Sequence, residues 1–276
     1  PLRVITRRQV AELQRRLGSG VVVDFAMRYG NPSTKSRIEA LKAAGCNRIL
    51  MAPLYPQYSA TTTGTANDSA FETLQQMRWQ PAIRTLPPYF EEPAYISALA
   101  QSIEEGVKAL DFEPDVVITS YHGMPKEYLE KGDPYHCECF KTARLLAEHL
   151  GLSKTQYKVS FQSRLGRAKW LEPYTEPTLI KMAGEGLKKV DLVCPGFTSD
   201  CLETLEEINM EAREAFLHAG GEGFSYIPCL NSNPVWLDAL TDLTEQHLQG
   251  WPTRSSVEPQ ELQAARERAL AMGATN

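Results

Sequence analysis

The chain has 276 residues, of which 42% are hydrophobic, and its formal net charge at pH 7 is −5. This apolar fraction supports a buried core and excludes a disordered chain. An acidic balance without a basic block excludes a typical nucleic-acid-binding protein, and no stretch approaches the ~20 apolar residues of a membrane span. The first residue is Pro1 rather than Met, so we expect a segment of the natural chain to precede it.

The chain contains six cysteines, too few for a disulfide scaffold of this length. They are Cys46, Cys137, Cys139, Cys194, Cys201 and Cys229. Free thiols in a reducing cytoplasm are the expectation. Cys137 and Cys139 form a Cys-x-Cys pair, which is too short for the usual zinc knuckle and would be strained as a disulfide.

Helix and strand patterns alternate through the first part of the chain. The periodicity predicts helices over 6–17, from Asn31-Pro32-Ser33 to Gly45, over 66–78 and over 92–110. Short apolar runs predict strands over 21–26, 48–52 and 82–86.

The same alternation continues in the second part. The predicted strands are 115–119, 157–161, 190–194 and 223–228, and the predicted helices are 137–150, 176–187, 200–218 and 234–248. Residues 249–257 have the composition of a linker, and a polar helix is predicted over 258–271. Most of these strands are continuous apolar runs, which favours parallel sheets covered on both faces.

A break at 111–114 divides the strands into two series. We therefore predict an α/β fold with two Rossmann-like lobes, each a parallel sheet flanked by helices. The first lobe would span 1–113, completed by helix 234–248, and the second would span 114–232, with 249–276 as a C-terminal linker and helix. The chain has no G-x-G-x-x-G after a strand, so a nucleotide cofactor is not supported.

Ligands of such sheets bind beyond the carboxyl ends of the strands, where this chain places aromatic residues, one histidine and a carboxylate. That set suits a flat, largely apolar ligand with a polar reacting centre. His122 stands out because it follows a strand within a short loop, and a purely structural histidine is the alternative. Glu203, Glu207 and Glu211 recur every four residues, which places them on one helix face. They form either a solvated acidic face or a row of oxygen ligands for Fe²⁺ or a similar metal.

Several segments containing these residues resemble the ferrochelatase family. They are 120–125 (SYHGMP), 132–135 (GDPY), 161–166 (FQSRLG) with Trp170-Leu171, and 195–207 (PGFTSDCLETLEE). The segments around Arg28-Tyr29, Tyr55 to Ser59 with 62–64, and 230–234 match as well, so the resemblance runs from Pro1 to about residue 248.

The resemblance implies a lyase that inserts Fe²⁺ into protoporphyrin IX, the last step of protoheme synthesis, without ATP and with the porphyrin in a cleft between the lobes. It implies that His122 and Glu203 are catalytic and that Arg28, Tyr29 and Tyr55 contact the porphyrin. His122, Glu203, Glu207 and Glu211 would contact the metal, the last two on a helix with a π-type widening. Which of His122 and Glu203 meets the metal first, and which of them takes the proton, stays open.

The chain departs from the family pattern at its start. Family members open with a glycine-containing strand and a helical lip over the porphyrin, and both would precede Pro1. Any peripheral membrane contact would come from that lip. We therefore expect the 276 residues alone to be poorly soluble or inactive, with the second lobe retaining its local fold.

The cysteines depart from the animal pattern. Animal members hold a [2Fe–2S] cluster through one loop cysteine and three near the C-terminus. Here Ala60 occupies the loop position and no cysteine follows Cys229, so that cluster is not expected and no cofactor is required. A cluster using Cys137 and Cys139 stays open as an alternative. Cys201 replaces the histidine that follows the Ser-Asp pair in animal members.

Three other functions stay open beside this one. Two are close variants, insertion of iron into coproporphyrin and insertion of cobalt into a corrin precursor. The third is a non-catalytic heme- or iron-binding fragment.

Overall fold

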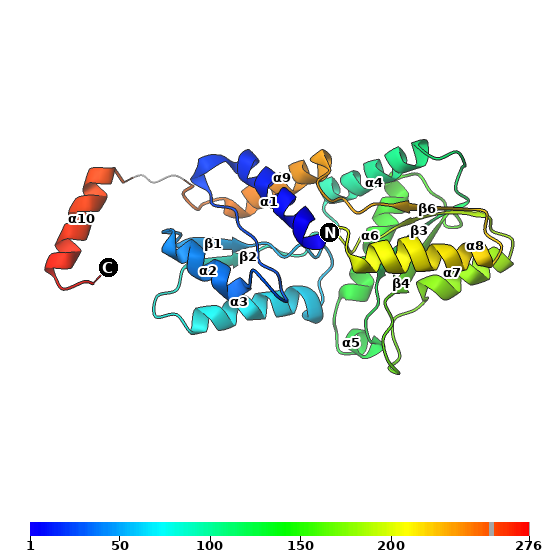
Figure 1. Cartoon of the computed structure of the whole chain (residues 1–276), viewed down its shortest axis with the longest axis horizontal. Helices are drawn as coiled ribbons and strands as arrows, with labels where there is room; N and C mark the ends of the chain where they lie inside the picture. Colours follow the sequence, from blue (N-terminus) through cyan, green and yellow to red (C-terminus); the bar gives the residue numbers. More distant parts are fainter. Residues whose placement is uncertain (254–256, 276) are drawn as a thin grey trace.

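The computed structural model describes residues 1–253 and 257–275, in which two parallel sheets lie along the long axis of an elongated molecule (Figure 1). The first sheet pairs β1 (Arg48–Met51) with β2 (Ala82–Thr85). The second has the order β4-β3-β5-β6. Its strands are β3 (Val116–His122), β4 (Tyr157–Gln162), β5 (Lys189–Val193) and β6 (Gly223–Ile227). The predicted α/β fold with two lobes is confirmed.

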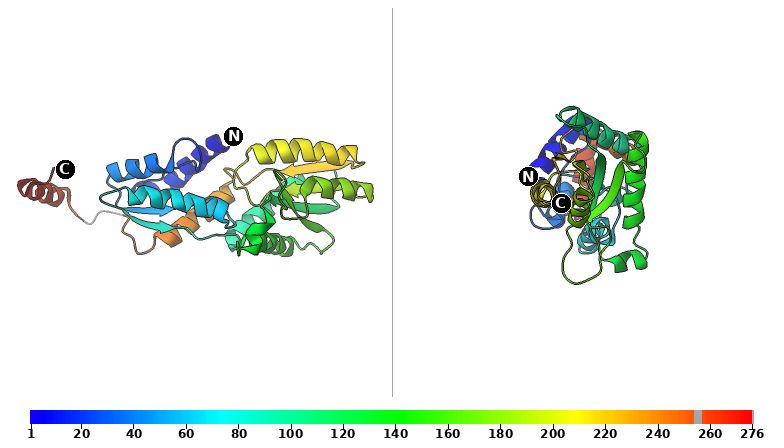
Figure 2. Two further views of the ribbon diagram at one scale, coloured as in Figure 1. Left: turned by 90° about the horizontal axis from the view of Figure 1, so that it is seen from below. Right: turned by 90° about the vertical axis from the view of Figure 1, so that its right-hand side faces the viewer.

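Helices flank both sheets (Figure 2). Those of the first half are α1 (Leu2–Leu17), α2 (Thr34–Ala43), α3 (Thr65–Gln75) and α4 (Pro93–Lys108). Those of the second half are α5 (Lys126–Glu130), α6 (Tyr135–His149), α7 (Thr175–Gly184), α8 (Arg213–His218), α9 (Pro234–Leu248) and α10 (Pro259–Ala271). A short 3₁₀ turn, η1 (Gly18–Gly20), and two π-helical segments, η2 (Ala60–Gly64) and η3 (Glu203–Ala212), complete the described elements. None of the described helices has the length and apolar character needed to cross a bilayer.

The predicted elements are mostly present, with shifted ends. The helix predicted from residue 200 is divided between η3 and α8, and α5 was not predicted. Helix α10 projects away from both sheets in Figure 1. Part of the predicted linker, 254–256, lies outside the described residues. The division of the chain into lobes at 113/114 and 232/233 stays a prediction.

The prediction of a strand over 21–26 is wrong. No strand of the described chain pairs with this segment. The side-chain amide of Gln14 takes the place of a neighbouring strand, because its Nε2 donates to the Val21 carbonyl at 2.8 Å and its Oε1 accepts from the Val23 amide at 2.9 Å. β-branched residues favour an extended backbone, but a ladder also needs a second chain segment beside it.

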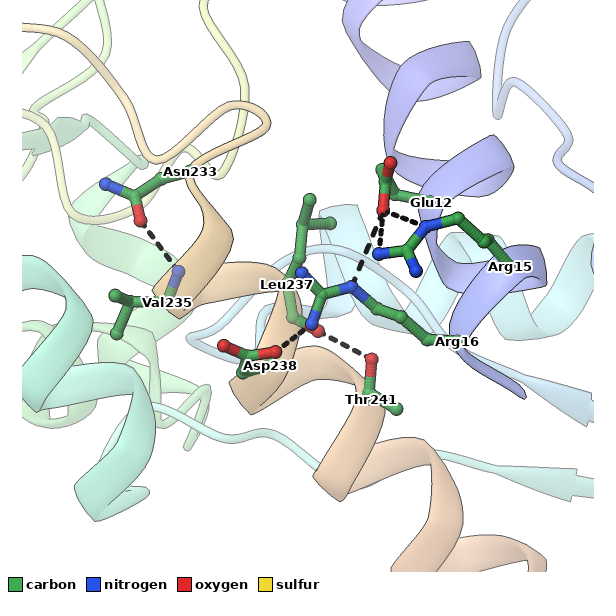
Figure 3. Close-up of polar contacts among 8 residues, drawn as sticks. All are labelled: Glu12, Arg15, Arg16, Asn233, Val235, Leu237, Asp238 and Thr241. Carbon is green, nitrogen blue, oxygen red and sulfur yellow. Dashed lines mark hydrogen bonds and ion pairs between the residues drawn. The ribbon is translucent and has the colours of Figure 1, made fainter. Parts of the chain in front are cut away.

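Helix α1, near the start of the chain, packs against helix α9. The Arg16 guanidinium pairs with Asp238 of α9, and Glu12 accepts from Arg15 one turn away (Figure 3). The first turn of α9 is capped by Asn233, whose Oδ1 accepts from the Val235 amide at 2.9 Å. This cap accounts for the start of α9 at Pro234. Proline fits the first helical position because a backbone N–H there would have no acceptor within the helix.

The largest buried cluster joins the two halves of the molecule. It includes Trp236 of α9 stacked on Tyr89, with Tyr95 of α4 packed edge-on against both rings. Helix α4 also packs against β6, where a side chain on Gly106 would place its Cβ 2.2 Å from Ile227 Cδ1. The core is therefore continuous from α9 to the four-stranded sheet.

Asp191 is a carboxylate in the middle of the buried strand β5. Neither of its oxygens has a hydrogen-bond partner among the described residues, and its side chain is fully buried. Burial raises its pKa to about 6, and the nearby Ser225 hydroxyl and Leu192 amide oppose this shift without reaching hydrogen-bond geometry.

We expect Asp191→Asn to stabilise the protein increasingly as pH rises. A pKa raised from 3.8 favours the folded state while the carboxyl is protonated, and this advantage is lost as pH increases through about 6. The difference in unfolding free energy between variant and wild type should grow by about 1.5 kcal/mol from pH 5 to pH 8. Urea unfolding at both pH values measures it, with the exposed Asp111→Asn as control. Parallel pH curves for wild type and Asp191→Asn would contradict the assignment.

Candidate functional site

The candidate site lies at the carboxyl edge of the four-stranded sheet. In the order β4-β3-β5-β6, β3 is followed in sequence by β4 on one side, and the chain then crosses to β5 on the other side of β3. Such a reversal of strand order is where ligands bind in open parallel sheets. His122 is the last residue of β3, not a loop residue after it as the sequence predicted, and the chain leaving β5 leads into η3 at Glu203. One predicted catalytic residue therefore ends a strand beside the reversal, and the other follows a strand beside it.

His122 is the last residue of β3 and is half-buried. Its Nδ1 lies 2.6 Å from the carbonyl oxygen of Gly123, so Nδ1 carries the proton and Nε2 is the nitrogen with a free lone pair. The Gly123 amide donates to the Gln162 carbonyl at 2.7 Å, and a Cβ at this glycine would lie 2.7 Å from the same oxygen. The loop can approach β4 this closely only with glycine after the histidine.

Gln162 connects the strand of His122 to the segment of Glu203. It ends β4 directly opposite His122 in the parallel register. Its Nε2 donates to the backbone carbonyl of Glu203 at 2.7 Å, and its Oε1 accepts from the Ser120 hydroxyl at 2.8 Å. The sequence places this residue at a strand end but gives no signal for these contacts, since the partners are 41 and 42 residues away.

Segment η3 carries the predicted row of glutamates. Glu203 and Glu207 are half-buried and Glu211 is exposed, so the row runs from the sheet edge toward solvent. The π-type widening that the family resemblance implied is confirmed over the ten residues of η3. Both carboxylate oxygens of Glu207 accept from Ser163, one from the backbone amide and one from the hydroxyl, each at 2.5 Å.

A buried aspartate anchors the start of η3. Asp200 Oδ1 accepts from the Tyr226 hydroxyl at 2.6 Å and from the Thr204 hydroxyl at 3.1 Å, and Oδ2 accepts from Asn231 Nδ2 at 2.6 Å. The sequence motif around Asp200 gives this residue no role of its own. The structure gives it four donors, counting the Cys229 amide, and thereby a role in holding η3.

The predicted metal-contacting residues do not form a closed cage. Among the residues that the structure describes, no three histidine, cysteine, aspartate or glutamate side chains converge on one point. The metal contacts expected of His122, Glu203, Glu207 and Glu211 therefore stay a prediction.

The three residues predicted to contact the porphyrin come from the first half of the chain. The Arg28 guanidinium lies 4.6 Å from the centre of the Tyr29 ring, and the Tyr29 side chain is 74% exposed. Burial raises the pKa of the Tyr55 phenol; Tyr29 and Glu203 raise it further, while Arg28 opposes the shift. Tyr55 is therefore near enough to Arg28, Tyr29 and Glu203 for each of their charges to act on its phenol.

The loop that carries Tyr55 is bonded to the second half of the chain. The Tyr58 amide donates to Glu138 Oε2 at 2.6 Å, and Asp133 Oδ2 accepts from the Ala60 amide at 2.8 Å. Gln57 donates to the Thr142 hydroxyl at 3.0 Å. Residues of α6 and of the turn before it therefore position the first-half side of the site.

The cysteines offer no thiolate ligand set. Cys139 is fully buried while Cys137 is exposed, because residues two apart on helix α6 point about 200° apart. The two thiols do not converge, which is evidence against the alternative in which both bind one cluster. Burial, with Glu203 nearby, raises the pKa of Cys201 to about 12, so this thiol stays protonated at neutral pH.

A cavity of about 870 Å³ lies elsewhere, between the end of α1 and the end of α9. Its lining includes Leu17, Leu248 and Trp251 but none of the predicted site residues. It is therefore separate from the candidate site.

The comparisons with known proteins point in one direction. The ferrochelatase family model matches residues 1–248. A ferrochelatase of Allorhizobium ampelinum is 56% identical over 252 residues, which cover 91% of this chain and 73% of that protein. A ferrochelatase of a Polaromonas species is 53% identical over 277 residues, covering 99% of this chain and 75% of that protein.

Solved structures show the same fold at low sequence identity. SirB from Bacillus subtilis with Fe³⁺ superposes with a TM-score of 0.60 at 14% identity, covering 87% of this chain and 88% of SirB. DR2241 from Deinococcus radiodurans, described as similar to chelatases, gives 0.58 at 13% identity, covering 97% of this chain and 56% of that one. On the sequence match and the shared fold, the chain belongs to the ferrochelatase family.

Proposed function

We propose that this protein is a ferrochelatase that inserts Fe²⁺ into protoporphyrin IX and forms protoheme, the final step of heme biosynthesis. The observation that carries the proposal is that His122, at the end of β3, and Glu203, at the start of η3, are joined through Gln162 at the reversal of strand order. Fe²⁺ and the porphyrin are the substrates, no further cofactor takes part, and the enzyme works in the cytoplasm. The match to ferrochelatases favours iron insertion over cobalt insertion or a carrier role.

His122 serves as the proton acceptor. A free-base porphyrin must lose two pyrrole protons as the metal bonds to its four nitrogens. A neutral imidazole accepts one such proton through Nε2 at physiological pH, passes it to solvent, and then accepts the second. The Gly123 carbonyl bonded to Nδ1 keeps the ring in the required tautomer and stabilises the imidazolium that forms.

The glutamates serve the metal. Glu203 lies where the row meets the sheet edge and holds the cation beside the ring, while Glu207 and the exposed Glu211 lead to it from solvent. An open ligand set releases the cation to the ring nitrogens, which a complete cage would oppose. Arg28, Tyr29 and Tyr55 contact the macrocycle, and the binding energy of its faces offsets the strain of bending it.

The test of the proposed function is metal insertion itself. Purified full-length protein is mixed with protoporphyrin IX and Zn²⁺, and the fluorescence of zinc-porphyrin is followed, with Fe²⁺ under anaerobic conditions as the second assay. Turnover with both metals is expected. Tight porphyrin binding without turnover would support a carrier instead.

His122→Ala should abolish metal insertion while porphyrin binding survives, because the ring faces provide most of the binding area. Zinc-porphyrin formation and porphyrin fluorescence titration measure the two properties separately. His149→Ala, at the exposed end of α6, is the control and should retain normal rates. Near-normal turnover in His122→Ala would remove this residue from the mechanism.

Glu203→Gln and Glu207→Gln should affect different kinetic parameters. The first should lower kcat by orders of magnitude, since a neutral amide cannot hold the cation beside the ring. The second should mainly raise the apparent KM for the metal, because delivery precedes bond formation. Glu206→Gln, on the exposed side of η3, is the matched control. Equal losses in both parameters at both positions would argue against a delivery path.

Protein purified anaerobically should be colourless. Cys137 and Cys139 point to opposite sides of α6, and the loop position used by animal members is Ala60. Absorption spectra with iron and sulfide analysis provide the measurement. Stoichiometric iron and sulfide with a visible band would show that a cluster is bound, and Cys137→Ser would then be the first variant to make.

A further inference from the structure

The carboxylate of Glu207 is already engaged before any metal arrives. Its Oε1 accepts from the Ser163 backbone amide and its Oε2 from the Ser163 hydroxyl, each at 2.5 Å. Hydrogen bonds to an ionised carboxylate are the strong class of protein hydrogen bonds. A single residue of the loop after β4 therefore holds both oxygens of the middle glutamate in the row.

Ser163 adopts an uncommon backbone conformation to make these bonds. Its φ is +61°, in the left-handed region that an L residue with a Cβ seldom occupies. It directly follows Gln162, whose side chain donates to the Glu203 carbonyl at 2.7 Å. Two consecutive residues thus form hydrogen bonds with η3, Gln162 at Glu203 and Ser163 at Glu207.

This arrangement sets up a competition. Ser163 occupies one of the two lone-pair sites on each oxygen of Glu207, and a divalent cation at the remaining sites draws on the same negative charge and repels the positive ends of the N–H and O–H dipoles. A cation reaching Glu207 from the exposed Glu211 must therefore share or displace the Ser163 donors. When the cation leaves, the same donors are in place to take the carboxylate back.

We propose that Ser163 is a positioning residue that sets how tightly Glu207 takes up the metal and how readily it releases it toward Glu203. The inference rests on the proposed function, because it deepens the role of the glutamate row. Losing the hydroxyl removes one of the two competitors, so Glu207 should bind the metal more tightly. Loss of one hydrogen bond to a charged group corresponds to a change of roughly ten- to a hundredfold in affinity.

Ser163→Ala in the full-length protein tests the proposal. The apparent KM for Zn²⁺ at saturating protoporphyrin should fall roughly ten- to a hundredfold. Calorimetric titration with Co²⁺ in the absence of porphyrin should show the same tightening. The KM for porphyrin should stay near that of the wild type, since it does not depend on the competition.

Two further variants separate the hydroxyl from the backbone. Ser163→Gly also lacks the hydroxyl but adopts φ +61° without strain, so it should shift the metal KM as the alanine variant does. In a Glu207→Gln background, Ser163→Ala should have no further effect on the metal KM. A metal KM that is unchanged or raised in Ser163→Ala, or an equal shift in the Glu207→Gln background, would overturn the proposal.

The outcome also distinguishes the inference from the proposed function. If the wild type fails to form zinc-porphyrin, the proposed function fails, while the Co²⁺ titration still decides whether Ser163 and a cation compete for Glu207. If only the porphyrin KM or the melting temperature changes in Ser163→Ala, the residue is structural and the proposal is wrong.

Discussion

The side-chain amide of Gln162 is the interaction on which the geometry of the site depends. Its backbone lies in β4 opposite His122, and its side chain reaches across to the Glu203 carbonyl and the Ser120 hydroxyl. A buried amide is costly unless its donor and acceptor are both used, and here both are. The histidine and the first glutamate are thus held in relation to each other by one residue that takes no part in the chemistry.

Polar contacts of the same kind join the two halves of the chain. Gln9 of α1 is buried and donates to the Asn231 carbonyl at 2.8 Å, while the Thr198 hydroxyl donates to the Leu54 carbonyl at 3.2 Å. The Tyr95 hydroxyl donates to the Pro195 carbonyl within the shared core. The residues next to Tyr55 and those leading to Glu203 are therefore fixed to one another as well as to their own sheets.

The parts of the structure that follow from local pattern were predictable. The continuous apolar runs of β3 and β5 and the proline-initiated α9 need only neighbouring residues to be recognised. The apolar run at 21–26 does not form the predicted strand, because a strand requires a paired strand beside it. The Gln14 side chain provides only two hydrogen bonds to this segment instead. The acidic row was visible in the spacing, and the family resemblance implied the π widening. The contacts of Gln162 and Ser163 with η3 were not predictable, since they join residues more than 40 positions apart.

The buried bonds between the two halves have a mechanical consequence. When two bodies are pressed together, the deformation concentrates in the more compliant of the two. A pair of lobes tied by Gln9, Tyr95 and Gln57 is stiff across the line that separates them. The proposed function places a porphyrin there, and a porphyrin is a thin plate whose out-of-plane bending is its softest motion. Under that proposal, a mismatch in shape between protein and ligand would be stored as curvature of the ring rather than as an opening of the protein.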